Sequence, residues 1–196
     1  MVEIEGKADR EASLTFVKFV RLFRIRLVTQ GVKATLWWMF NVFNRVVLDR
    51  PLRAQCEITP HLFVGAQFRR RGWRILQGWG INGVINLRAE FDDRQLGVVL
   101  PNYLHLPTVD DSAPSLQDLH AGVAFYRRIK ANGGKVYIHC GAGVGRAPTM
   151  AAACLIAEGF TPEAAWEKIR QVRIFIRPTR VQQEQIQRFA EMQAQQ

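Results

Sequence analysis

The sequence has few of the residues that hold small proteins together through metal ions or disulfides. It contains three widely separated cysteines, Cys56, Cys140 and Cys154, and four histidines that form no cluster. No two cysteines have the CxxC spacing of a zinc site, and the three do not make the disulfide framework of a small secreted protein. We therefore expect no metal and no cofactor, and an intracellular, reducing compartment in which thiols stay free.

The chain also lacks a recognisable targeting or membrane-spanning segment. Its first dozen residues, MVEIEGKADREA, include four acids, whereas secretory and mitochondrial leader peptides are poor in acids. The aromatic-rich uncharged stretch 34–44 is far shorter than the ~20 apolar residues that a bilayer span needs. We expect no signal peptide and no full transmembrane span, and a location that is cytoplasmic or peripheral to a membrane.

Acidic residues are scarce over a long part of the chain, since between residues 14 and 88 only Asp49 and Glu57 occur. The whole sequence has 27 Lys and Arg against 17 Asp and Glu, a formal net charge of +10. Such an excess favours anionic partners, either a membrane surface or phosphorylated substrates. No nucleic-acid-reading motif is recognisable, so we do not expect nucleic acid as the partner.

The N-terminal part, residues 1–50, is predicted to be a basic, aromatic-rich helical extension. A first helix is expected to begin at Ser13, which can act as its N-cap, and Gly31 is expected to end or bend it. Lys and Arg alternate with apolar and aromatic side chains, including Trp37 and Phe40. Residues 13–48 could therefore lie at an anionic membrane surface. The alternative is a helix packed on the rest of the protein, with arginine side chains reaching to water.

The second part, residues 51–196, has the pattern of an α/β domain. Short β-rich runs occur at 62–66, 84–88, 103–107 and 136–140, and helical patterns at 69–79, 115–131, 147–158, 162–171 and 179–194. Strands that alternate with helices indicate a mostly parallel sheet covered on both faces. The fold class is therefore α/β, with a central sheet of four to five strands flanked by helices.

The segment VYIHCGAGVGRAPTM (136–150) contains the groups of an anion-binding site. An apolar strand ends at Cys140, a glycine-rich loop follows, and a helix is expected to begin near Arg146. The curled loop can point successive N–H groups inward, and the helix N-terminus adds its positive dipole end. These amides would stabilise a thiolate on Cys140, and Arg146 would grip a phosphate with two N–H bonds. The expected phosphate-binding residues are Gly141, Ala142, Gly143, Val144 and Gly145.

The pattern His-Cys-x5-Arg after an apolar strand resembles the signature of cysteine-dependent phosphatases of the dual-specificity class. The similarity extends over about residues 58–191. The segments 108–111, 114–116, 122–125 and 149–153 resemble most the mitochondrial-type phosphatidylglycerophosphate phosphatases. The resemblance implies the dual-specificity phosphatase fold and hydrolysis of phosphate monoesters through a phosphocysteine on Cys140. Cys154, on the following helix, is expected in the core, and whether it pairs with Cys140 is left open.

The resemblance also places a general acid at Asp110, in the loop 108–114, with Asp111 as the alternative. His139 would support the thiolate, either by orienting the loop or by tuning its electronics. Glu90 could line the cleft, position Arg146 or belong to a solvated loop, as could Asp92 and Asp93. Gln182 could help to orient water, but on its own it is expected on a helix surface.

Two positions depart from the family pattern. Ala147 stands where the family usually has Ser or Thr to assist the thiolate as leaving group, so slower breakdown of the phosphoenzyme is expected. Gly141 stands where many phosphoinositide-directed relatives carry a lysine, which makes recognition of several phosphates by the loop itself less favourable.

Three functions remain open on the sequence. The leading one is a lipid phosphatase acting on a substrate such as phosphatidylglycerophosphate. The alternative is a protein phosphatase for phosphotyrosine, phosphoserine and phosphothreonine. A non-catalytic phosphate-binding module is suggested only by Ala147, and the presence of Cys140 and Arg146 argues against it.

Overall fold

The computed structural model describes residues 2–97 and 102–195, with the side chains of residues 20–97 and 102–195. Two compact units are present, Met1–Phe40 and Asn41–Gln196, and each is described by itself. No helix of the described residues has both the length and the apolar character that crossing a bilayer requires.

The first element, α1 (Val2–Val46), is interrupted at Gly31, whose φ of 81° and ψ of 174° are not helical. Only glycine adopts this conformation readily, so the expected bend at Gly31 is confirmed. The expected start at Ser13 is wrong, because the helix already begins at Val2. The preceding residues are rich in Glu, Lys, Arg and Ala, which are good helix formers and extend the helix toward the N-terminus.

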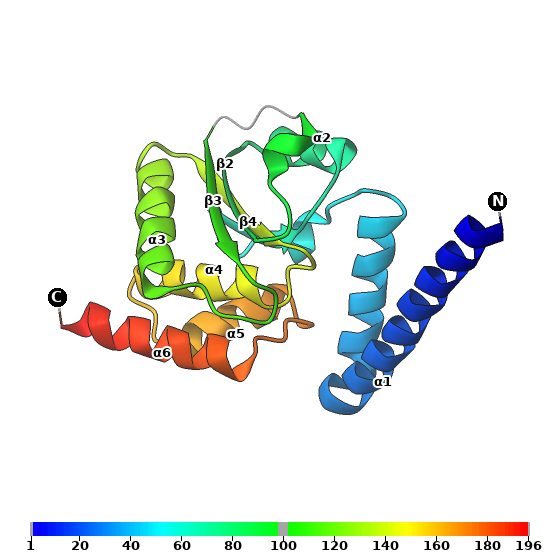
Figure 1. Cartoon of the computed structure of the whole chain (residues 1–196). Helices are drawn as coiled ribbons and strands as arrows, with labels where there is room; N and C mark the ends of the chain where they lie inside the picture. Colours follow the sequence, from blue (N-terminus) through cyan, green and yellow to red (C-terminus); the bar gives the residue numbers. More distant parts are fainter. Residues whose placement is uncertain (1, 98–101, 196) are drawn as a thin grey trace. The chain divides into compact units, whose positions relative to one another are not determined.

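The unit 41–196 is built on one parallel sheet in the order β1-β4-β2-β3 (Figure 1). Its strands are β1 (Leu62–Ala66), β2 (Ile81–Arg88), β3 (Tyr103–Thr108) and β4 (Lys135–Cys140). The two central strands, β4 and β2, are buried along most of their length, as expected for strands covered on both faces. The expected α/β fold with a parallel sheet is confirmed, with four strands in the described residues.

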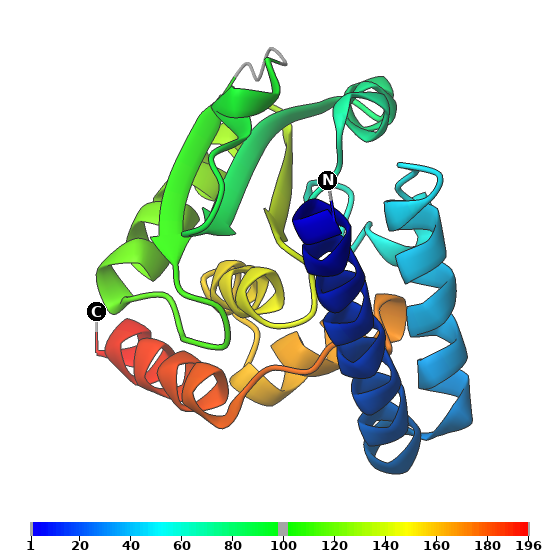
Figure 2. The ribbon, with the colours of Figure 1, turned by 45° about the vertical axis from the view of Figure 1, so that its right-hand side comes forward.

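Five helices follow or separate the strands. They are α2 (Arg70–Gly78), α3 (Leu116–Ala131), α4 (Arg146–Ile156), α5 (Pro162–Val172) and α6 (Arg180–Ala194). Short 3-10 turns occur at Arg53–Gln55 and Asp93–Leu96. In Figures 1 and 2, α4, α5 and α6 lie together on one side of the sheet.

Two apolar clusters fill the two sides of the sheet. The larger contains buried side chains of α3, α4, α5 and α6, among them Leu119, Met150, Ile169 and Phe189. The smaller packs Trp73 and Leu76 of α2 against strand residues such as Tyr137. Because both faces are covered, the polar ends of the strands remain as the place where a site can be built.

Candidate active site

Cys140 is the last residue of β4, at the carboxyl edge of the sheet, and its side chain is only 3% exposed. The Gly143 N–H points at its sulfur, with an N–Sγ distance of 3.3 Å. The following five residues, 141–145, form a curled loop that ends at the first residue of α4, Arg146. We call residues 141–145 the phosphate loop.

The phosphate loop has the tight backbone that its glycines predict. Gly143 has φ of 68°, and a Cβ added there would lie 2.3 Å from the Gly65 carbonyl oxygen. The N–H groups of Ala142, Val144 and Gly145 have no hydrogen-bond acceptor among the described residues. Such a set of unused donors at a helix N-terminus is suited to bind an anion.

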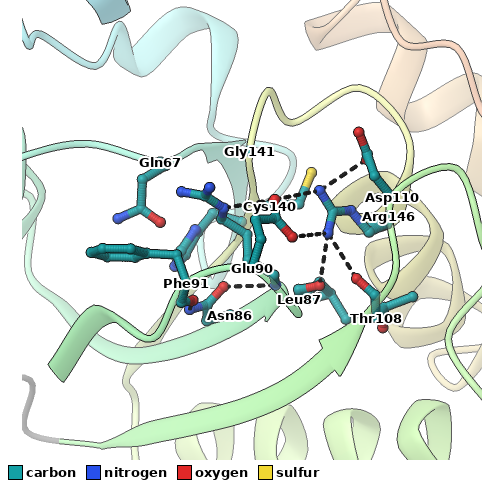
Figure 3. Close-up of polar contacts among 12 residues, drawn as sticks. Gln67, Asn86, Leu87, Glu90, Phe91, Thr108, Asp110, Cys140, Gly141 and Arg146 are labelled. Carbon is teal, nitrogen blue, oxygen red and sulfur yellow. Dashed lines mark hydrogen bonds and ion pairs between the residues drawn. The ribbon is translucent and has the colours of Figure 1, made fainter. Parts of the chain in front are cut away.

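Arg146 is buried, and its guanidinium lies next to Cys140 (Figure 3). Its Nη1 donates to the carbonyls of Leu87 and Thr108, at 3.3 and 2.8 Å. Both Nη atoms also contact the Glu90 carboxylate, at 2.9 and 3.0 Å, and Nη2 lies 2.9 Å from Asp110 Oδ1. Its buried Nε has no partner in the described part of the chain, which leaves a donor for a bound oxyanion.

The Glu90 carboxylate accepts hydrogen bonds from both Nη atoms of Arg146, which is the contact that a positioning role requires. The hydrogen bond from Arg146 lowers the pKa of Glu90 to about 2, so the carboxylate is ionised at neutral pH. Its second neighbour, Arg88, donates from Nε at 2.9 Å.

Asp110 and Asp111 lie on the loop that leaves β3, and they are oriented differently. The Asp110 side chain is 78% exposed and reaches Arg146. Asp111 has a positive φ of 61° and its carbonyl accepts a hydrogen bond from the Thr179 hydroxyl. Of the two carboxylates, only that of Asp110 contacts Arg146 within the described residues.

His139 sits below the phosphate loop in a fully buried position. Its Nε2 lies 2.6 Å from Asp93 Oδ2, and the other oxygen of Asp93 accepts from Gln67 Nε2 at 2.8 Å. The ring also contacts Trp73 edge-on and stacks on Tyr137, with centroid distances of 5.6 and 5.8 Å. The sequence left Asp93 open between the cleft, a contact with Arg146 and a solvated loop. The structure excludes the solvated loop, because Asp93 is fully buried and its carboxylate contacts His139 and Gln67.

Two further residues at the phosphate loop were missed or misplaced by the sequence reasoning. Arg173, at the end of α5, is fully buried and its Nε donates to the Gly143 carbonyl at 3.2 Å. Gln182 was expected on a helix surface, but only 1% of it is exposed. Its side chain caps α6 together with Thr179 and donates to the Ser112 carbonyl at 2.8 Å. The spacing Thr179-x-x-Gln182 is the capping-box signature, which could have revealed the capping role of Gln182. The contacts of Gln182 with Ser112 and of Arg173 with Gly143 have no local signal in the sequence.

Of the two positions that depart from the family pattern, Gly141 is the first residue of the phosphate loop and Ala147 lies in the first turn of α4. Ala147 is fully buried, and the Thr149 hydroxyl donates to the Gly145 carbonyl at 2.9 Å. Thr149 therefore uses its proton within the helix. Cys154 is buried in the apolar core as a free thiol, and burial raises its pKa well above the usual value.

Comparison with known proteins identifies a family. A family model described as "Polymorphic toxin system, DSP-PTPase phosphatase" matches residues 64–160. The human protein named phosphatidylglycerophosphatase and protein-tyrosine phosphatase 1 is 32% identical over 167 residues, covering 76% of this chain and 82% of that protein. Its mouse counterpart is 37% identical over 120 residues, and the match spans 62% of its length, less than two thirds.

Solved structures of the same kind share the fold. The crystal structure of PTPMT1 in complex with PI(5)P has a TM-score of 0.64 and 30% identity to this chain. The alignment covers 70% of this chain and 96% of the PTPMT1 chain. The human dual specificity protein phosphatase 1 is more distant, at 28% identity over 124 residues.

Proposed function

Because this chain belongs to the family of dual-specificity-type protein tyrosine phosphatases, we propose that it hydrolyses phosphate monoesters through a covalent phosphocysteine on Cys140. The single observation that carries the proposal is the geometry at the end of β4. There the Cys140 sulfur accepts from the Gly143 N–H, next to a buried arginine whose Nε has no partner in the described residues. That arrangement presents a nucleophile and an oxyanion cradle at one point.

In the first step, the Cys140 thiolate attacks phosphorus while the phosphate loop and Arg146 bind the non-bridging oxygens. The S–P bond forms as the bond from phosphorus to the ester oxygen breaks. Asp110 gives its proton to that oxygen, so an alcohol leaves. In the second step, water attacks phosphorus and gives its proton to Asp110. The S–P bond breaks, which restores the thiolate and releases inorganic phosphate.

The remaining residues of the site position these groups. Glu90 accepts from both Nη atoms of Arg146 and so fixes the orientation of the guanidinium relative to the phosphate loop. His139, fixed by Asp93, supports the end of β4 where the thiolate sits. We propose Asp110 rather than Asp111 as the general acid, because the Asp110 carboxylate lies beside the phosphate-binding arginine.

The mechanism is tested by Cys140→Ser in the full-length protein. We expect release of inorganic phosphate from p-nitrophenyl phosphate to fall below detection, because a serine hydroxyl is a much weaker nucleophile than a thiolate. The variant should still bind inorganic phosphate in a calorimetric titration, since the loop and Arg146 are intact. Turnover that survives in Cys140→Ser would refute the phosphocysteine.

The proposed substrate class is a phospholipid with a terminal phosphate monoester, with phosphatidylglycerophosphate as the leading candidate. Support comes from relatives that are named as phosphatidylglycerophosphatases and from the PTPMT1 structure determined with PI(5)P. A protein phosphatase is the second candidate, since relatives include named dual specificity protein phosphatases. Phosphate release from phosphatidylglycerophosphate, a phosphoinositide and phosphopeptides, compared at equal concentration, separates the two.

A phospholipid substrate requires access to a membrane, and we propose that the unit 1–40 supplies it. Val32, Leu36 and Phe40, spaced four residues apart on α1, form one exposed apolar stripe, with exposed fractions of 62%, 59% and 49%. Exposed basic side chains, Lys33 and Arg24 among them, lie on the same unit. A helix with exposed apolar and basic side chains fits the interface of an anionic phospholipid bilayer.

A further inference from the structure

The phosphate loop contains no cationic side chain of its own, yet arginines surround its first residue. A Cβ at Gly141 would lie 3.7 Å from Arg146 Nη2, 3.7 Å from Glu90 Oε1 and 4.0 Å from Arg88 Nε. Gly141 therefore faces two arginines and the carboxylate that they share, all from other segments. Arg146 and Arg88 are both paired with Glu90, so neither contributes a fully free charge.

A third arginine reaches the phosphate loop from the last turns of α1. Arg45 lies in the same compact unit as the loop, and its Nη1 donates to the Gly141 carbonyl at 3.0 Å across 96 positions of sequence. Its other N–H groups have no hydrogen-bond partner within the described ranges. No carboxylate of the described residues forms an ion pair with Arg45. Arg45 differs in this from Arg88 and Arg146, which both pair with Glu90.

The backbone that carries Arg45 is firmly held. Asn41, one turn before it, donates to the buried Gln55 side chain at 2.7 Å. The carbonyl of Val46, the next residue, accepts from Arg69 Nη2 at 2.8 Å. The Asp49 carboxylate accepts from the backbone N–H of Arg69 and of Gly72, at 2.7 and 3.0 Å, at the start of α2. Arg45 is therefore presented to the loop by a fixed scaffold.

The hydrogen bond to the Gly141 carbonyl places the Arg45 guanidinium beside the residue that follows the reacting cysteine. Partial burial lowers the pKa of its guanidinium, while the Cys140 thiolate acts in the opposite direction. Even a lowered arginine pKa leaves the group cationic at neutral pH. A partly desolvated cation with spare donors gains most from a charge-assisted contact with an anion.

We infer that Arg45 binds a second anionic group of the substrate, namely the phosphodiester that lies beside the phosphate to be removed. The inference rests on the proposed function, because phosphatidylglycerophosphate carries a monoester at one end of a glycerol and a diester at the other. Arg146 and the loop amides hold the monoester, and Arg45 holds the diester. Arg45 is thus a specificity-determining residue, and it supplies the cation that Gly141 lacks.

The test compares full-length Arg45→Met and Arg45→Lys with Arg50→Met, which removes a nearby exposed arginine with no contact to the loop. Each change is introduced into Cys140→Ser, so that binding is measured by calorimetry without turnover. The ligands are short-chain phosphatidylglycerophosphate, which has both anions, and glycerol 3-phosphate, which has the monoester alone. We expect Arg45→Met to weaken binding of the lipid about tenfold, the effect of one charge-assisted contact. Its binding of glycerol 3-phosphate should change by less than about twofold.

The remaining results decide the inference. Arg45→Lys should keep part of the preference for the lipid over glycerol 3-phosphate, and Arg50→Met should keep all of it. If Arg45→Met lowers the affinity for both ligands equally, Arg45 only supports the loop. If it lowers neither affinity, Arg45 does not touch the substrate. Both results overturn the inference. Turnover of p-nitrophenyl phosphate by the protein with Cys140 intact reports separately on the phosphatase activity, so a failure of that activity is recognised as such.

Discussion

Arg146 makes five contacts with oxygen atoms in the described structure, and two carboxylates are among its partners. A buried guanidinium needs such partners, because an unpaired buried charge is costly. Its Nε has no partner within the described residues, and we propose that this N–H binds the substrate phosphate. At the scale of single residues, the site is therefore organised around one arginine whose orientation is set before any ligand binds.

Asp110 can be tested at the same scale. In Asp110→Asn, hydrolysis of an alkyl phosphate should fall about 10²-fold, because general acid catalysis contributes ~10²–10⁴-fold where the leaving group is poor. Hydrolysis of p-nitrophenyl phosphate should fall much less, since nitrophenolate leaves without a proton. Steady-state rates on the two esters give the comparison.

Asp111→Asn is the matched control, because it changes the neighbouring carboxylate on the same loop. Its rates on both esters should stay within about twofold of the unchanged protein. If Asp111→Asn lowered the rate on the alkyl phosphate selectively and Asp110→Asn did not, Asp111 would be the general acid.

At the scale of elements, the site depends on parallel strands whose carboxyl ends meet at one edge of the sheet. β4 supplies Cys140, the segment after β2 supplies Glu90, and the segment after β3 supplies Asp110. β4 and β2 are neighbours in the sheet, as are β2 and β3. Three segments far apart in sequence are thereby brought within reach of Arg146, at the start of α4.

The contact between the ends of β2 and β4 gives a pH-dependent prediction. The pKa of Glu90 is about 2 in the folded protein, below its ordinary value of 4.5. A carboxylate with a lowered folded-state pKa stabilises the fold above pH 4.5, and this contribution is lost as pH falls from 4.5 to 2. In Glu90→Gln the contribution is absent at every pH. The difference in denaturation midpoint between the two proteins should therefore shrink across this window.

Glu184→Gln provides the control for that measurement. Glu184 is exposed to a similar extent and pairs with Arg180 on α6, away from the strand ends. Since Glu90 is itself partly exposed, solvent screens its ion pair and the effect should be modest. If the difference in denaturation midpoint between the unchanged protein and Glu90→Gln stayed constant from pH 6 to pH 2, protonation of Glu90 would not affect stability and the prediction would be wrong.

At the scale of the whole molecule, the net charge of +10 sets the long-range attraction to anionic surfaces. Attraction of this kind weakens with salt, while burial of apolar side chains in the interface does not. Binding to anionic vesicles should therefore have a salt-sensitive part from the charge and a salt-resistant part from the apolar stripe of α1.

The double change Leu36→Ser and Phe40→Ser removes most of that stripe in the full-length protein. Co-sedimentation with vesicles of phosphatidylglycerol and phosphatidylcholine should fall at least about tenfold, since each buried Leu or Phe contributes ~1.5–3 kcal/mol. Turnover of p-nitrophenyl phosphate should be unchanged. Val181→Ser, which removes an exposed apolar side chain of α6, should bind vesicles normally. Undiminished co-sedimentation of the double variant would exclude the stripe as the membrane contact.

Sequence alone determined the parts of this protein that depend on neighbouring residues. The predicted strands and the helices after residue 68 agree with the structure to within about three residues, because periodicity and capping are local signals. Cys140, the phosphate loop and Arg146 are also contiguous, so their meeting required no knowledge of the fold. The bend at Gly31 was predictable for the same reason.

Only the tertiary structure decided which distant groups complete the site. Asp93 meets His139 across 46 positions, Gln182 meets Ser112 across 70, and Arg45 meets Gly141 across 96. A buried acid, a capping amide and a loop-binding arginine look like ordinary polar residues in the sequence, because nothing near them in the chain reveals their partners. Their roles arise from packing, which brings separate segments to one edge of the sheet and removes water from between them.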